Sequence, residues 1–338
     1  MKHLWFERGA YASKKARHYV ETEFAPEKIK KIAVIRHAAL GDQVIVRPFL
    51  VEARKFFPNA EITLVAVSNY MYGVPNDLVD HVHVMPGKER GKKVSIKEKV
   101  SNIKQLGEQD IVFDLASTNR SHWMTVLSKA KIKMGFPYKW YLRGSLFNMA
   151  VCRSDFQPEV ECMMDMLKLL GHNPSHPLDF AYPDHRQLKS TDNPFVLYFN
   201  GASQQSKILS KEQMYGVLEK AIQENPNYVH IYLEGKNEFE KGDFCQELLK
   251  YPNFRIQPCL PLEQLVELTA KATLMVAPDT GVRNVAISTH TPTVGIFYST
   301  VPFRYTPLYE QHSIVMKSNG DIPSIEQITH AIQAALQN

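Results

Sequence analysis

The chain has 338 residues, of which 44% are hydrophobic and 22% charged, and its formal net charge is +5 at neutral pH. This composition excludes a disordered or fibrous protein, and the length predicts two domains. No apolar run approaches the roughly 18 residues of a membrane span, and the N-terminus lacks the apolar stretch of a secretory signal, so we expect a cytoplasmic protein.

Positive charge is concentrated in the first part of the chain. Residues 1–180 hold 27 lysines and arginines against 19 aspartates and glutamates, whereas residues 181–338 hold 13 against 16. A solvated surface would explain each basic cluster taken alone, but their confinement to one part favours an anionic partner. No recognised nucleic-acid motif accompanies the clusters, so we expect no nucleic acid among the partners.

Apolar runs alternate with helical patterns in the first part. Strands are expected at 31–37, 61–67, 81–85 and 110–115, with a crossover helix within 43–57. Strand, helix and strand within about 35 residues form a βαβ unit, which implies a parallel sheet covered by helices on both faces.

The same alternation restarts after a stretch rich in proline and aspartate. Strands are expected at 195–201, 228–234, 254–257, 272–278 and 293–297, and helices over about 210–224, 237–250, 261–271, from Asp279 onward and at 324–338. We therefore predict an α/β protein with two Rossmann-like domains. The expected organisation is a basic and aromatic extension at 1–29, a first domain at 30–180, a linker at 181–194 and a second domain at 195–338.

The loop after the first strand reads IRHAALGDQ. It matches neither the GxGxxG nor the P-loop pattern, so no nicotinamide, flavin or other cofactor is expected. Asp42 begins the helix that follows, at the carboxyl edge of the sheet where ligands bind in open α/β folds. Two interpretations stay open: a helix N-cap, or a carboxylate that accepts a proton from an incoming hydroxyl.

A second loop, in VAPDTGVRN, also connects a strand to a helix. Asp279 and Thr280 cap the helix, and Gly281 keeps the turn free of side chain so that backbone N–H groups can approach a ligand. Capping alone explains Asp279 but not Gly281, so the pattern favours a phosphate site at this helix N-terminus.

The turn NGASQQSK and the end of the next strand provide further polar groups at the same edge. Lys207 is placed to neutralise a diphosphate. Glu234, Lys236 and Glu238 follow the next strand, where a carboxylate would bind ribose hydroxyls, although surface ion pairing is the default explanation. No Asp-x-Asp pair occurs, so no metal site is expected. The remaining candidate donors in the turn are Asn200, Gly201 and Ser203.

Several segments in the same order resemble glycosyltransferase family nine, the ADP-heptose:lipopolysaccharide heptosyltransferases. They are IRHAALGDQVIVRPFLVEARKFFPNAEITLVA, DIVFDLASTNRS, KIKMGFP and CLPLEQLVELTAKATLMVAPDTGVRNVAISTHTPTVGIF. The resemblance covers roughly residues 30–338. It implies a GT-B fold, with two Rossmann-like domains whose parallel sheets face across a cleft. It also implies an inverting, metal-independent transfer from an ADP-heptose-like donor to an anionic glycolipid.

The resemblance also implies roles for individual residues. Asp42 would be the general base, and Lys207 would meet the diphosphate of the donor. Asp279, Thr280 and Gly281 would hold the donor. Beyond the resemblance, the candidate donor-binding residues also include Asn200, Gly201, Ser203, Glu234, Lys236 and Asn284, and the candidate acceptor-binding residues are His37, Arg120, Lys139 and Arg143.

The chain departs from the family pattern where the donor would bind. The family usually has DTGxxH, but here Asn284 stands at the histidine position and is preceded by Arg283. The donor sugar therefore stays open, and two alternatives remain: a transferase of the same fold with another nucleotide sugar, and a non-catalytic nucleotide- or carbohydrate-binding protein.

The N-terminal extension combines Trp5, Phe6 and Tyr11 with the basic residues of KKAR at 14–17. Aromatic and basic residues together favour an anionic membrane surface, so we expect peripheral contact with the cytoplasmic face of the inner membrane. The competing interpretation is that the basic residues hold the phosphates and carboxylates of the acceptor.

Overall fold

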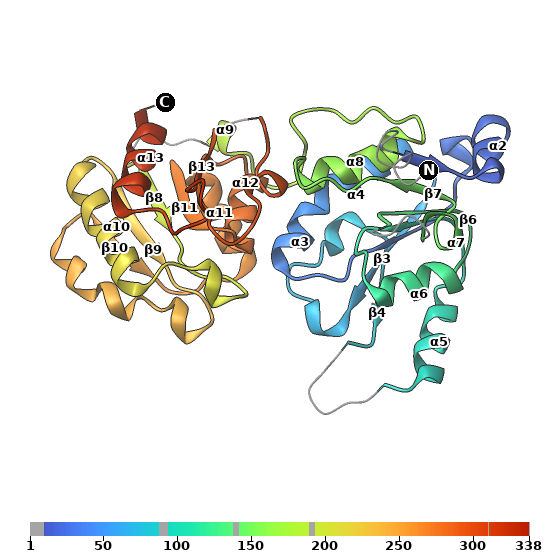
Figure 1. The fold of residues 1–338 in the computed structure, drawn as a ribbon, viewed down its shortest axis with the longest axis horizontal. Helices are drawn as coiled ribbons and strands as arrows, with labels where there is room; N and C mark the ends of the chain where they lie inside the picture. The colour runs from blue at the N-terminus through green and yellow to red at the C-terminus, as the bar shows by residue number, and fades with distance from the viewer. Residues whose placement is uncertain (1–9, 88–93, 138–141, 189–192, 310, 338) are drawn as a thin grey trace. The chain divides into compact units, whose positions relative to one another are not determined.

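The computed structural model describes residues 10–87, 94–137, 142–188, 193–309 and 311–337. The chain divides into two compact units, Met1–Ala181 and Tyr182–Asn338, which are drawn in Figure 1. Each unit is built around its own sheet, and each is described by itself.

The described part of the first unit contains a seven-stranded sheet in the order β1-β7-β6-β5-β2-β3-β4, parallel except that β1 runs antiparallel to β7. Its strands are β1 (Ala10–Ala12), β2 (Lys31–Ile35), β3 (Glu61–Val67), β4 (His81–Met85), β5 (Glu108–Asp114), β6 (Lys129–Gly135) and β7 (Met149–Val151). The four strands expected in this part are therefore confirmed. The helices are α2 (Lys14–Thr22), α3 (Leu40–Ile45), α4 (Arg47–Phe56), α5 (Ile96–Gln105), α6 (Asn119–Leu127), α7 (Leu142–Ser145) and α8 (Glu159–Lys168), with 3-10 helices at Pro26–Lys28, Ser68–Tyr70 and Asn76–Leu78.

The central strand β2 is buried on both faces, as is typical of strands in a parallel sheet. Residues 32–35 are completely buried, because helices cover both faces of the sheet. Ala33 and Ile35 pack in one apolar cluster with Val65 of β3 and Val112 of β5. The apolar run of β2 lacks polar alternation because side chains on both faces of the strand are buried.

Residues 10–22 form a strand and a helix, whereas the sequence of this extension indicated only its basic and aromatic character. β1 pairs with β7, with Tyr11 opposite Ala150. Ser13 caps α2 by accepting the N–H of Ala16 at 3.1 Å. This part of the extension is therefore an edge of the first sheet.

The expected crossover helix at 43–57 is two helices, α3 and α4, that meet at Val46. Pro48 lacks an N–H and fits only the first turn of a helix, so a new helix begins at Arg47.

The described part of the second unit contains a six-stranded parallel sheet in the order β10-β9-β8-β11-β12-β13. Its strands are β8 (Phe195–Tyr198), β9 (Val229–Leu233), β10 (Phe254–Gln257), β11 (Leu274–Pro278), β12 (Thr293–Ile296) and β13 (His312–Val315). The five strands expected in this part are confirmed, and β13 is additional. The helices are α9 (His185–Leu188), α10 (Lys211–Glu224), α11 (Leu262–Lys271), α12 (Gly281–Ser288) and α13 (Ile325–Gln337), with 3-10 helices at Gln205–Lys207, Glu238–Glu240, Gly242–Lys250 and Pro302–Arg304.

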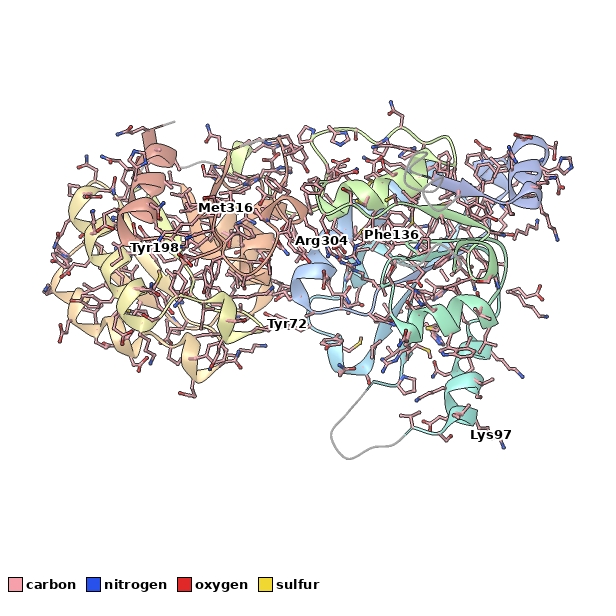
Figure 2. The ribbon with its side chains drawn as sticks, viewed as in Figure 1. Tyr72, Lys97, Phe136, Tyr198, Arg304 and Met316 are labelled. Carbon is pink, nitrogen blue, oxygen red and sulfur yellow. The ribbon has the colours of Figure 1, made fainter. Side chains whose placement is uncertain are left out.

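The core of the second unit surrounds β8. Tyr198 is fully buried among the strands (Figure 2), and its hydroxyl lies 2.8 Å from Nδ1 of His230 on β9. The final helix α13 packs against α10 and contributes Ile328 and Ile332 to the same core. The last helix therefore belongs to the second unit.

Two segments differ in detail from the sequence-based expectation. The expected helix at 237–250 consists of two 3-10 helices with extended backbone at Lys241 between them. Within the stretch 181–194, expected as a linker, α9 carries the buried His185, whose Nδ1 lies 2.9 Å from the main-chain oxygen of Ala270. Part of this stretch is thus packed into the second unit.

None of the helices in the described ranges has both the length and the apolar character needed to cross a membrane.

A buried carboxylate joins α4 to the chain that follows α8. The side chain of Glu52 is 2% exposed and lies 2.8 Å from Nζ of Lys55 and 2.6 Å from Nε2 of His172. Burial by itself would raise the pKa of Glu52, but the hydrogen bonds from Lys55 and His172 outweigh it and hold the pKa below its ordinary value.

We predict that Glu52→Gln lowers the free energy of unfolding of the first unit by about 2 kcal/mol near neutral pH. Because the native pKa of Glu52 is depressed, its contribution is complete above the unfolded-state pKa and is lost as pH falls through the native pKa. The deficit should therefore shrink on acidification. Urea unfolding followed by tryptophan fluorescence measures it, since Trp5, Trp123 and Trp140 all lie in this unit. The exposed Glu21→Gln is the control, and an equal loss in both variants would contradict the assignment.

Candidate active site

The strand order of the first sheet reverses at β2. This strand pairs with β3 on one side and β5 on the other, so the connections that leave β2 and β5 run in opposite directions. In open parallel sheets, ligands bind outside the carboxyl ends of the strands at such a switch point. The loop after β2 leads to Asp42 in α3, and the loop after β5 leads to Arg120 in α6.

Asp42 lies in the first turn of α3 and is held by Arg36, the residue that follows β2. Nη2 of Arg36 donates to Oδ1 of Asp42 at 2.8 Å, and Nε donates to the main-chain oxygen of Asp42 at 3.2 Å. The Arg36 side chain is 3% exposed and the Asp42 side chain 39%. Ala39 occupies the N-cap position of α3. The carboxylate is therefore fixed from the protein interior and reachable from solvent.

His37 follows Arg36 and is partly buried, with both of its ring nitrogens enclosed. Neither ring nitrogen has a hydrogen-bond partner among the residues that the structure describes. Burial, with a smaller contribution from the Arg120 cation, lowers the pKa of His37 to about 3, so the ring is neutral at physiological pH. Unsatisfied buried polar atoms are costly; a ligand hydroxyl or phosphate oxygen would accept from the N–H of the ring, and a ligand hydroxyl would donate to the other nitrogen.

The other predicted acceptor residues are less completely defined. Arg120 is partly buried near the start of α6, whose N-terminus is closed by a capping box between Thr118 and Ser121. Lys139 lies outside the described residues. Arg143 belongs to α7, but its side chain lies outside the described part of the chain.

The strand order of the second sheet reverses at β8, which pairs with β9 and β11. The loop after β8 carries Lys207, and the chain after β11 carries Asp279. Nζ of Lys207 donates to Oδ2 of Asp279 at 2.7 Å, and the two side chains are 19% and 10% exposed. Residues 72 positions apart are thus brought together at the switch point.

The first turn of α12 starts directly after Asp279. Thr280 is the N-cap, its side chain forms no capping bond, and Gly281 is the first helical residue. The N-terminus of a helix carries partial positive charge and backbone N–H donors, which suit a phosphate. With Lys207 beside it, this turn can hold a diphosphate.

The predicted donors Asn200 and Gly201 have local structural partners. The side-chain amide of Asn200 donates to the main-chain oxygen of Leu209 and accepts its N–H, both at 3.0 Å. A Cβ on Gly201 would lie 2.5 Å from the ring of Phe199 and 2.6 Å from the carboxylate of Glu240. These two residues stabilise the loop after β8 through contacts within the protein and do not present side chains to a ligand.

Glu234, Lys236 and Ser203 complete the predicted donor set. Oε1 of Glu234 accepts a hydrogen bond at 2.8 Å from the N–H of Gly242, the first residue of the 3-10 helix Gly242–Lys250. Lys236 and Ser203 are exposed. The structure therefore gives Glu234 a role within its own loop and leaves the other two on the surface.

Arg283 and Asn284, where the chain departs from the DTGxxH pattern, are both buried in α12. Arg283 donates to the main-chain oxygen of Tyr305 and to Oγ1 of Thr306, each at 3.1 Å, and its guanidinium lies 5.2 Å from the ring centre of Phe297. Burial lowers the pKa of Arg283 to about 10, so it stays charged at neutral pH. Arg283 thus anchors α12 to the rest of the unit.

Arg36 is a functional residue that the sequence interpretation missed. The signal was present, because a charged residue directly after the apolar run KIAVI is buried only when a carboxylate accompanies it.

Comparison with known proteins identifies related chains. Residues 100–332 match the family model described as glycosyltransferase family 9 (heptosyltransferase). The lipopolysaccharide core heptosyltransferase OpsX of Haemophilus influenzae is 24% identical over an alignment of 302 residues, and the match covers 86% of this chain and 85% of that protein.

Solved structures show the same architecture. The E. coli heptosyltransferase WaaC with ADP and with ADP-2-deoxy-2-fluoro heptose superposes with TM-scores of 0.70 and 0.69, at 16% identity, covering 91% of this chain and 99% of each of those chains. This likeness confirms the predicted α/β fold with the two domains of the GT-B class.

Proposed function

Because this chain belongs to glycosyltransferase family 9, the heptosyltransferases, we propose that it transfers a heptose or related sugar from an ADP-sugar to the inner core of lipopolysaccharide. The activity of the Haemophilus influenzae relative, a lipopolysaccharide core heptosyltransferase, supports the acceptor, and the ADP-containing ligands of the E. coli structures support the donor. In this proposal the transfer inverts the anomeric centre and needs no metal ion.

The position of Asp42 is the observation that carries the proposal. An inverting displacement requires a base that takes the proton of the acceptor hydroxyl as that oxygen attacks the anomeric carbon. Asp42 supplies a carboxylate at the switch point, anchored by Arg36 and 39% exposed. Orientation and access are thus combined in one side chain.

The Lys207–Asp279 pair supports the donor side of the proposal. The leaving group of an ADP-sugar is a diphosphate, whose negative charge grows as the glycosidic bond breaks. Lys207 supplies a cation and the first turn of α12 supplies N–H donors. Asp279 keeps the lysine at that turn before the donor binds.

The acceptor is assigned to the first unit. Inner-core lipopolysaccharide carries phosphates and carboxylates, which fits the net positive charge of residues 1–180. His37 has two unsatisfied ring nitrogens, and Arg120 lies near enough to lower its pKa. We assign the acceptor's anionic groups to this neighbourhood, together with Lys139 and Arg143.

The basic surface of α2 supports contact with the membrane that carries the acceptor. Lys14, Lys15 and Arg17 are exposed along this helix, and Lys131 of β6 lies over the ring of Tyr19, 5.3 Å from its centre. Trp5 and Phe6 lie outside the described residues. Each basic residue near an anionic surface contributes about 1 kcal/mol of attraction.

We predict that Asp42→Asn lowers kcat by about 100- to 10,000-fold, the usual contribution of general-base assistance. Donor binding should be preserved, because the donor is assigned to the second unit. Single-turnover kinetics with an ADP-sugar and a lipopolysaccharide acceptor measure the first effect, and calorimetry with ADP measures the second. Wild-type turnover by the variant would remove Asp42 from the mechanism and favour a different base, whereas no turnover by the wild-type protein itself would favour a binding protein.

We predict that Lys207→Met weakens donor use about tenfold or more, because a charge-assisted contact to the diphosphate is lost. EDTA should leave wild-type turnover unchanged. Lys211→Met is the matched control, since Lys211 pairs with Asp243 on an exposed surface. A strict requirement for Mg²⁺ or Mn²⁺, or equal effects of the two variants, would contradict the assignment. A panel of nucleotide sugars in the same assay tests the identity of the donor.

We predict that the protein sediments with anionic vesicles at low salt and is released as salt rises, because exposed charges are screened over about 8 Å at physiological ionic strength. Replacing Lys14, Lys15 and Arg17 by glutamine should abolish sedimentation. Equal partitioning onto anionic and neutral vesicles, or none onto either, would rule out the membrane contact and leave these residues to the acceptor.

A further inference from the structure

A second carboxylate, Glu159, lies behind the Arg36–Asp42 pair. Glu159 is the first residue of α8, and its side chain is 1% exposed. Oε1 lies 2.9 Å from Nη1 of Arg36, and Oε2 accepts a hydrogen bond from Nη2 of Arg153 at 2.5 Å. The carboxylate is therefore enclosed between two guanidinium groups, and only Arg153, at 20% exposed, reaches toward solvent.

The guanidinium of Arg36 connects Glu159 to Asp42. Nη1 faces Glu159 and donates to the main-chain oxygen of Leu115 at 2.6 Å, while Nη2 donates to Asp42. A guanidinium is planar and rigid, so contacts on one edge fix the direction of the other. The four side chains form a continuous series, Arg153–Glu159–Arg36–Asp42, from solvent through the interior to the switch point.

The charges of this series decide how strongly Arg36 acts on Asp42. Burial by itself would raise the pKa of Glu159, but Arg36 and Arg153 outweigh it and hold the pKa below its ordinary value, so Glu159 is ionised at neutral pH. An arginine that faced Asp42 alone would make its carboxylate a weak base. The negative charge of Glu159 offsets part of that effect.

Other charged and titratable groups border the series. Asp114, at the end of β5, has its pKa raised to about 6 by burial, and Arg36 is among the groups that oppose this rise. His37 is neutral at physiological pH and is influenced by Arg120 of α6. These groups stay in place in the variants described below.

We propose that Glu159 and Arg153 are positioning residues that act through Arg36 to orient Asp42 and to keep its carboxylate basic enough to accept the acceptor's proton. The proposal rests on the assignment of Asp42 as the general base. Loss of Glu159 would leave Arg36 with more effective positive charge toward Asp42. Without Arg153, the negative charge of Glu159 would be offset less, and Glu159 would reduce the effect of Arg36 on Asp42 further.

The test compares Glu159→Gln with Arg153→Gln, because the two substitutions change the charge of the series in opposite senses. The midpoint of Asp42 is followed by carbon-13 carboxyl titration and assigned by its disappearance in Asp42→Asn. The acid limb of kcat/KM is measured in parallel. We expect Glu159→Gln to lower both midpoints by about one pH unit and to lower the plateau of kcat about threefold to tenfold.

Arg153→Gln should raise both midpoints by about half a pH unit. The shift is smaller than for Glu159→Gln because Arg153 stands one side chain further from Asp42 in the series. A merely structural role would lower activity in both variants without moving the midpoints in opposite directions. The matched controls are Glu161→Gln and Lys168→Gln on α8, which make the same charge changes outside the series, where Glu161 pairs with His176 and Lys168. Both controls should leave the Asp42 midpoint in place.

Unmoved midpoints in both variants, or shifts in the same direction, would overturn the proposal, as would equal shifts in the controls. Glu159→Gln removes the buried charge that pairs with two arginines, and this loss can prevent folding. In that case the upward shift of the midpoints in Arg153→Gln tests the proposal by itself. Failure of the base assignment is recognised separately. In that case Asp42→Asn keeps full turnover, and the carboxyl titration still reports whether Glu159 and Arg153 control Asp42.

Discussion

Parallel pairing is the constraint from which the rest of this structure follows. A parallel neighbour is reached only through a crossover, so helices cover both faces of each sheet and the strands become buried apolar runs. Polar side chains that act on a ligand are excluded from those faces and gather where strands end. In each sheet the order reverses at one strand, β2 or β8, and the chain after that strand leads to Asp42 or Lys207.

Each switch point carries a cation paired with a carboxylate, but the two pairs differ in kind. Arg36 is buried, cannot lose its charge and is fixed by several acceptors, which suits a group that holds Asp42 in one orientation. Lys207 is a compact charge on a flexible stem and is partly exposed beside Asp279. A lysine of this kind can exchange a carboxylate for a phosphate, which suits a group that meets a substrate.

Several polar residues near these edges hold the protein together rather than face a ligand. Gln43 donates to the main-chain oxygen of Ala38 and so secures the loop before Asp42. Asn200 donates to the main-chain oxygen of Leu209 and so closes the loop that carries Lys207. Arg283 precedes Asn284, the residue at the histidine position of the family pattern, and its guanidinium packs on Phe297 and bonds the chain at Tyr305. These contacts attach α12 to the rest of the unit.

The sequence by itself determined the βαβ order, the strands β2 to β5 and β8 to β12, and both edge loops, because apolar periodicity and glycine or proline punctuation are local properties of the sequence. It also indicated Asp42, Lys207 and Asp279 as polar residues at strand ends. Only the tertiary structure decided their partners. The edge strand β1 is three residues long, too short for a periodic signal, and it exists because β7 lies beside it. Glu159 begins α8, a helix that the sequence interpretation did not include, and its contact with Arg36 crosses more than a hundred residues. The pairing of charged side chains depends on which strands and helices are neighbours. The packing of the whole unit sets those neighbours.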